Sequence, residues 1–99
     1  MLITLNPANG INSISTISIG SLNECIAHPR EIFKTAILTN AAKILLAHNH
    51  TSGKVIPSNA YINITRRAAE TGKIMGIELI DHIIIGDNNY TSLKEKGIL

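Results

Sequence analysis

Two histidines, His48 and His50, stand two residues apart at the end of the apolar run 43–47. An apolar run without polar alternation predicts a central strand covered on both faces, and alternation along a strand puts both imidazoles on the same side. Two imidazoles so placed can hold one metal ion, whereas a hydrolytic zinc site uses about three protein ligands and an open position for water. The alternative is that both histidines only bond backbone groups at the strand end. The pair therefore predicts part of a metal site, with a third ligand still to be found.

The elements that position this pair follow from periodicity and turn residues. Strand-forming runs at 2–5 and 11–19, separated by a turn with Asn-Gly, predict a hairpin with a bulge in its second run. Helical spacing predicts one helix over about 29 to 39, ended near Asn40, and a second from the N-cap Ser58 to about Ile74, closed by Gly76. The run 77–85 predicts the strongest strand, and 90–93 a short strand that pairs back on it. The expected order is ββαβαββ, an α/β (α+β) fold with a mixed sheet flanked by helices.

Composition narrows the class of protein. The 99 residues are 44% hydrophobic and 16% charged, which favours one globular domain with a β-branched aliphatic core. The net charge of +2 is scattered along the chain, so nucleic acid is not the expected partner. Arg66 and Arg67 point about 100° apart on a helix and favour a solvated face. The single Cys25 excludes an internal disulfide, and with no export signal or membrane segment in the pattern we expect a cytoplasmic protein.

Several ordered blocks extend the histidine pair into a family pattern. They are IGSLNECIAHPREIF at 19–33, AHNHTSG at 47–53, ITRRAAETGKIMGIELIDHIIIGD at 64–87 and SLKEKG at 92–97. Together they resemble the RadC family of the JAMM/MPN (JAB) metallopeptidase superfamily over essentially the whole chain. The resemblance implies a RadC-like JAMM/MPN domain over 1–99, N-terminally truncated and without the family's helix-hairpin-helix region. It also implies a curved sheet related to the cytidine-deaminase-like fold, with zinc as the cofactor.

The resemblance assigns site residues one position at a time. The superfamily pattern is an upstream glutamate, His-x-His, seven residues, serine, two residues, and aspartate. His48 and His50 match the metal ligands, and Ser58 matches the catalytic serine that hydrogen-bonds the developing oxyanion or the metal-bound water. Tyr61 stands where the pattern has its aspartate ligand. A phenol with an ordinary pKa near 10 is a poor replacement for a carboxylate that is already ionised at neutral pH.

The pattern's glutamate has no convincing counterpart either. By the family's spacing it would lie before Met1, and Glu24 and Glu31, the two acids that precede His48, fall in segments that the family places elsewhere. General-base assistance of this kind contributes roughly 10²- to 10⁴-fold in rate. We therefore expect zinc to be bound weakly or not at all, and peptidase activity from this chain alone to be impaired.

Three functional hypotheses follow from the resemblance. The first is a degenerate RadC-type JAMM domain that serves as an interaction module or a remnant. The second is a working zinc-dependent metallopeptidase or isopeptidase whose base comes from outside this chain, and the third is a DNA-repair-associated, DNA-binding module. Rescue of the metal site by Asp81, Asp87 or His82 is a less favoured prediction. The expected partner is a peptide or protein, and the exposed edge of the first strand predicts self-association.

Overall fold

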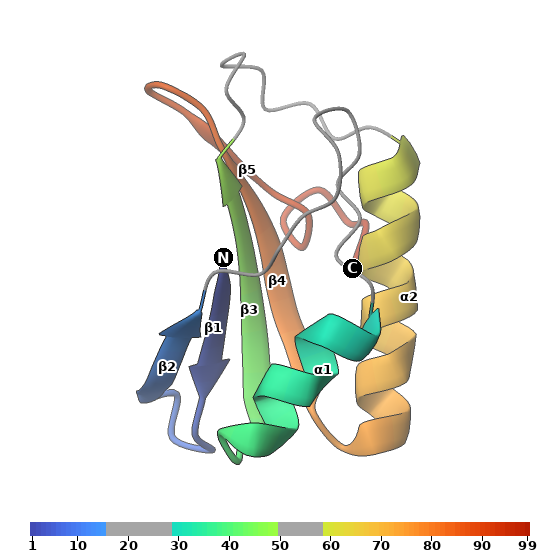
Figure 1. Ribbon diagram of the computed structural model, residues 1–99. Helices are drawn as coiled ribbons and strands as arrows, with labels where there is room; N and C mark the ends of the chain where they lie inside the picture. The colour runs from blue at the N-terminus through green and yellow to red at the C-terminus, as the bar shows by residue number, and fades with distance from the viewer. Residues whose placement is uncertain (16–28, 50–58) are drawn as a thin grey trace.

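The computed structural model describes residues 1–15, 29–49 and 59–99, apart from the side chains of Ala60 and Tyr61. Two helices and five strands follow one another as expected, and Figure 1 shows their arrangement. In chain order they are β1 (Leu2–Leu5), β2 (Ile11–Ser15), α1 (Pro29–Leu38), β3 (Lys43–Asn49), α2 (Asn59–Met75), β4 (Glu78–Ile85) and β5 (Tyr90–Ser92). The predicted order ββαβαββ is confirmed.

The five strands form one mixed sheet in the order β2-β1-β3-β4-β5. β1 pairs antiparallel with both β2 and β3, β3 and β4 are parallel, and β4 and β5 form an antiparallel hairpin. A parallel pair needs a crossover connection, and α2 supplies it between β3 and β4. The α/β (α+β) class with a helix-flanked mixed sheet is therefore confirmed.

The core lies between the helices and one face of the sheet. Alternation along the strands directs Leu2, Ile44 and Leu46 to this face, where Leu46 is opposite Leu2 in the register. Both helices send their apolar stripes to the same layer. The core cluster comprises Leu2, Ile32, Phe33, Ala36, Ile44, Leu46, Ala68, Ile77 and Leu79.

The opposite face of the sheet corrects one expectation. β3 is central, as predicted, but no helix of the described residues covers its second face, and Leu45 is only half-buried there. The predicted bulge is confirmed: Thr4 pairs with Ser13 and Leu5 with Ile11, which leaves Asn12 as the extra residue. Of the predicted strand 11–19, residues 16–19 lie outside the described residues.

Both helices end where their sequences predict. Asn40 follows α1 with φ 53°, and Gly76 follows α2 with φ 73°, the left-handed conformation that commonly terminates a helix. The amide of Ile77 donates to the carbonyl of Gly72 at 2.9 Å, so the chain turns sharply into β4. The N-cap predicted for Ser58 lies outside the described residues.

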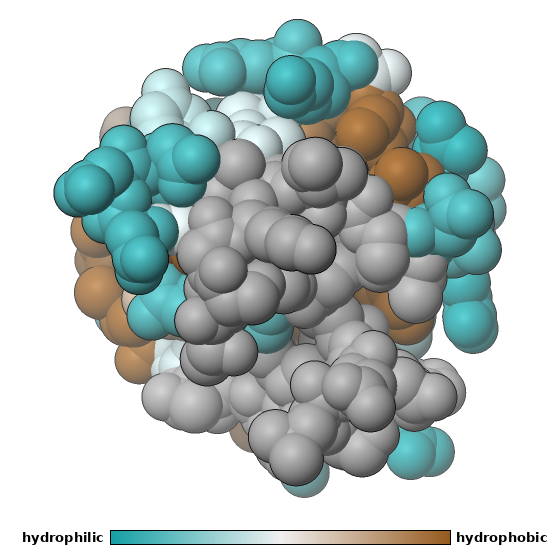
Figure 2. All heavy atoms as spheres, turned by 90° about the horizontal axis from the view of Figure 1, so that it is seen from above, coloured by the Kyte–Doolittle hydropathy of each residue, from teal (hydrophilic) through white to brown (hydrophobic). Residues whose placement is uncertain are grey.

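The surface of the molecule carries both apolar and hydrophilic side chains (Figure 2). Seen from above, apolar side chains reach the surface on opposite sides of the molecule, with hydrophilic side chains between them (Figure 2). No helix of the described residues is long and apolar enough to cross a membrane.

Candidate functional site

His48 is the one predicted site residue whose side chain the structure describes. It lies next to the last residue of β3, half-buried, at the carboxyl end of the parallel strands. Ligands of α/β sheets are commonly bound at this end. His50 and Ser58 lie outside the described residues, and Tyr61 belongs to the first turn of α2, with a side chain outside the description. Whether these side chains converge on one site stays a prediction.

A second histidine, His82, shares the helix-covered face with His48. The register pairs His82 with Leu46 and His48 with Ile84, so the two imidazoles belong to neighbouring strands one diagonal step apart. His82 is only 3% exposed, and its Nδ1 lies 2.6 Å from Oγ1 of the fully buried Thr65 on α2.

Burial decides the charge of His82. The pKa of His82 is lowered from 6.5 to about 4, first by desolvation and then by His48 and the chain's amino terminus, while Asp81 opposes the shift. His82 is therefore neutral at neutral pH. A neutral ring beside His48 adds no positive charge to that end of the sheet.

Asp81 is adjacent to His82 in sequence but faces the other side of the sheet, since its register partner is Leu45. Its Oδ1 accepts from the amides of His82 at 2.7 Å and Lys94 at 3.0 Å, and its Oδ2 accepts from the Ser92 hydroxyl. The carboxylate therefore holds the turn after β5 and does not approach His48.

Two of the residues weighed as a third metal ligand are engaged elsewhere: Asp81 on the opposite face of the sheet and His82 against Thr65. Asp87 follows β4 at the end of the sheet where His48 lies, and its role as a ligand stays a prediction. Within residues 1–15, 29–49 and 59–99 no three His, Cys, Asp or Glu side chains are placed to hold a metal ion. The prediction that His48 binds a metal therefore depends on residues outside the described ones.

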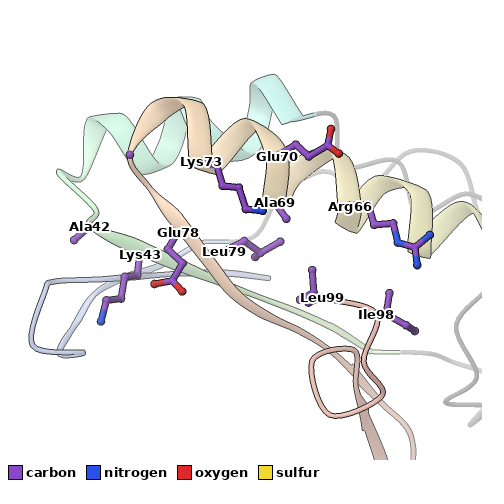
Figure 3. Close-up of a pocket in the computed structure, with 12 residues that line it drawn as sticks. Ala42, Lys43, Arg66, Ala69, Glu70, Lys73, Glu78, Leu79, Ile98 and Leu99 are labelled. Atoms are coloured by element: carbon purple, nitrogen blue, oxygen red, sulfur yellow. The ribbon is translucent and has the colours of Figure 1, made fainter.

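A cavity of about 580 Å³ opens at the other end of β3 and β4, between α2 and the last two residues of the chain (Figure 3). Arg66 and Lys73 extend toward it from one side of α2, and Leu79 and Leu99 form part of its apolar wall. Lys43, also at its rim, donates to Oδ1 of Asn9 at 2.8 Å. The described residues that line it are charged or apolar and include no imidazole, thiol or hydroxyl.

Sequence reasoning missed both the Thr65–His82 pair and this cavity. A signal for the pair existed: Thr65 occupies an apolar helical position three residues before Ala68, and His82 an inward-facing position of β4. A polar residue at a core-facing position predicts a buried partner. The cavity had no such signal, because its walls come from four separate segments.

Comparison with known proteins bears out the family resemblance of the chain. A family model described as RadC-like JAB domain matches residues 1–98. A UPF0758 protein of Desulfitobacterium hafniense is 53% identical over 98 residues, 99% of this chain and 43% of that protein. UPF0758 proteins of Clostridium acetobutylicum and Geobacillus sp. are 55% and 56% identical over 99% and 96% of this chain, and over 43% and 42% of their own lengths. The chain thus spans about two fifths of the length of these relatives.

Proposed function

The chain belongs to the RadC-like JAB domain family, and from that premise we propose that it is a degenerate, catalytically impaired member with a partial zinc site. His48 and His50 would be the zinc ligands, and Ser58 would serve the oxyanion. The observation that carries the proposal is Tyr61, which occupies the position of the aspartate ligand. The retained role would then be that of an interaction module for a peptide or protein.

The chemistry of the donor set supports this proposal. A bound zinc ion would supply an activated water by lowering its pKa toward 7. Two neutral imidazoles bring no negative charge to such an ion, and a phenol must first lose a proton with a pKa near 10. The cost of that deprotonation weakens zinc binding at neutral pH.

The placement of Glu31 and Asp81 also favours impairment. Glu31 is on the first turn of α1, where its exposed carboxylate lies 4.0 Å from Nε of Arg30. Asp81 is engaged by three donors on the opposite face of the sheet. Neither is positioned as a base for water near His48.

The proposal is tested by zinc titration calorimetry on the parent chain, Tyr61→Asp and Tyr90→Asp. Tyr90 is the chain's other tyrosine, 60% exposed on β5, and provides a matched control for adding a carboxylate. We expect Tyr61→Asp to raise zinc affinity at least about tenfold and Tyr90→Asp to leave it unchanged.

Three outcomes would count against the proposal. Tight one-to-one zinc binding by the parent, with no gain in Tyr61→Asp, would show that the site is complete without the carboxylate. Zinc-dependent hydrolysis of a peptide or isopeptide bond by the parent would favour a working metallopeptidase. Salt-sensitive DNA binding by the parent would instead favour the DNA-repair-associated module.

A further inference from the structure

The turn between β1 and β2 carries the sequence's one Asn-Gly pair, Asn9-Gly10, which the function proposed above does not use. The turn lies at the end of the sheet where β3 begins, whereas His48 lies near the other end of β3 (Figure 1). Asn9 is exposed and has φ 67°, and Gly10 has no side chain to shield its backbone nitrogen. Such a pair is chemically reactive, because the backbone nitrogen of the glycine can attack the side-chain amide of the asparagine.

The reaction open to this pair is deamidation. The backbone nitrogen of Gly10 loses its proton and forms a bond to Cγ of Asn9, and the side-chain nitrogen leaves as ammonia. Water then opens the resulting succinimide ring. Attack of water on Cγ gives aspartate, and attack on the main-chain carbonyl carbon gives isoaspartate, in which the main chain runs through Cγ. Either product has taken up one water, released one ammonia and gained a negative charge.

Two neighbours of the pair influence this reaction in opposite directions. Nζ of Lys43 donates to Oδ1 of Asn9 at 2.8 Å, and this oxygen becomes negatively charged when Cγ is attacked. In contrast, the amide of Gly10 donates to Oδ1 of Asn6 at 2.9 Å. A carboxamide oxygen accepts this proton in a hydrogen bond but is too weak a base to remove it. Lys43 therefore favours the attack, while Asn6 restrains the attacking nitrogen.

The Asn6 side chain is held firmly in this restraining position. Its Oδ1 also accepts from the amide of Ala8 at 2.9 Å, as asparagine side chains in turns commonly do. The amide of Asn6 donates to the carbonyl of Gly10 at 2.9 Å, so Gly10 is bonded to Asn6 through both of its backbone groups. A Cβ on residue 10 would lie 2.6 Å from Nδ2 of Asn6, which shows how closely the two residues pack. The nitrogen of Gly10 reaches Cγ of Asn9 only after these bonds open.

We propose that Asn9 is a site of slow deamidation, and that Asn6 limits its rate by holding the amide of Gly10. Aspartate at position 9 pairs with Lys43 and ties the turn to the start of β3, whereas isoaspartate lengthens the main chain and disturbs the turn. The modification is independent of the metal site, since the reacting atoms belong to residues 9 and 10 and water is the only other reactant.

The test incubates the 99-residue chain at neutral pH and body temperature, folded and in guanidinium chloride. Mass spectrometry of proteolytic fragments measures the conversion of amide to carboxyl at each asparagine. We expect the product at Asn9 in the folded chain to form at least about threefold more slowly than in the unfolded chain, since a hydrogen bond must open first. Absence of product at Asn9 in the folded chain, or equal rates in the two states, overturns the proposal.

Chain variants assign the restraint to Asn6. Asn6→Ala removes the acceptor and should speed deamidation of Asn9 in the folded chain at least about threefold. The matched control Asn6→Asp keeps an acceptor oxygen for Gly10 and should be no faster than the parent. Lys43→Met keeps the aliphatic stem without the ammonium and should slow the reaction at least about twofold. An unchanged rate in Asn6→Ala, or an equal increase in Asn6→Asp, overturns the proposal.

Two readouts distinguish this restraint from a general loosening of the hairpin. Asn12, the extra residue of the bulge, is also followed by a small residue, so a loosened hairpin would speed its deamidation together with that of Asn9. Amide hydrogen exchange of Gly10 should rise at least about threefold in Asn6→Ala. Exchange of the Ala42 amide, which donates to the carbonyl of Leu5 at 2.9 Å, should not change. A parallel rise at Asn12 or Ala42 overturns the proposal, as does unchanged exchange at Gly10.

Discussion

Acid destabilisation through His82 is the most quantitative consequence of the structure. Its pKa of about 4 in the folded chain compares with 6.5 for an ordinary histidine, because burial penalises the charged ring. Between pH 6.5 and pH 4, His82 binds a proton in the unfolded chain but stays neutral in the folded chain. The contribution of neutral His82 to the free energy of unfolding is therefore complete above pH 6.5. It is lost as the pH falls toward 4. The pKa difference corresponds to about 3 kcal/mol.

The assay is urea unfolding of the parent and His82→Gln at several pH values between 7 and 4. Glutamine retains an amide for the Thr65 hydroxyl and removes the titrating ring. We expect the parent to lose about 3 kcal/mol more free energy of unfolding across this range than His82→Gln does. Thr65→Val should keep the parent's pH dependence, since desolvation is the first cause of the pKa shift. Parallel losses in the parent and His82→Gln would refute the reasoning.

Three further predictions concern stability at pH 7, each measured as a free energy of urea unfolding. Ile44 is fully buried in the core, and Ile44→Ala should cost about 2–5 kcal/mol. Ile74 is 87% exposed, and Ile74→Ala should cost less than about 0.5 kcal/mol. Equal costs of the two substitutions would contradict the assigned core. Gly72→Ala should cost about 1–3 kcal/mol, because the added Cβ would lie 2.2 Å from the carbonyl oxygen of Ile77. An unchanged free energy of unfolding would contradict this close approach, since the backbone would then move aside at no cost. Asp81→Ala should cost about 1–3 kcal/mol through its three lost hydrogen bonds, and an unchanged value would remove its role in the turn.

The local elements were predictable because their signals are local. Asn40 and Gly76 end the helices since both adopt the left-handed conformation that their residue types tolerate. The alternation of β4 and the turn that follows it specify the hairpin with β5 in the same way.

The second face of β3, which no helix of the described residues covers, was not predictable from the same pattern. The run 43–47 contains apolar residues at both inward and outward positions, which is typical of a strand covered on both faces. Nothing within such a run tells whether its second cover is a helix of the same chain or another molecule. Leu45 is consequently half-buried where the pattern predicted full burial.

The candidate site also combines features that the sequence predicts with features that it does not. The end of β3 at His48 and Asn49 and the start of α2 follow from spacing, which places His48 at the carboxyl end of a parallel pair. The contact between Thr65 and His82 joins residues 17 positions apart and depends on the docking of α2. Asp81 and His82 are adjacent in sequence and face opposite sides of the sheet. Which of the two faces the helices depends on the register between β3 and β4, and that register has an irregularity between Ile44 and Leu45.

The central claim, that Tyr61 leaves the zinc site incomplete, is tested most directly by metal content. The parent chain is equilibrated with one equivalent of zinc at pH 7, passed through a desalting column, and its zinc is counted per protein. The incomplete donor set predicts that almost no zinc remains with the chain. Retention of one zinc ion per chain would contradict the account.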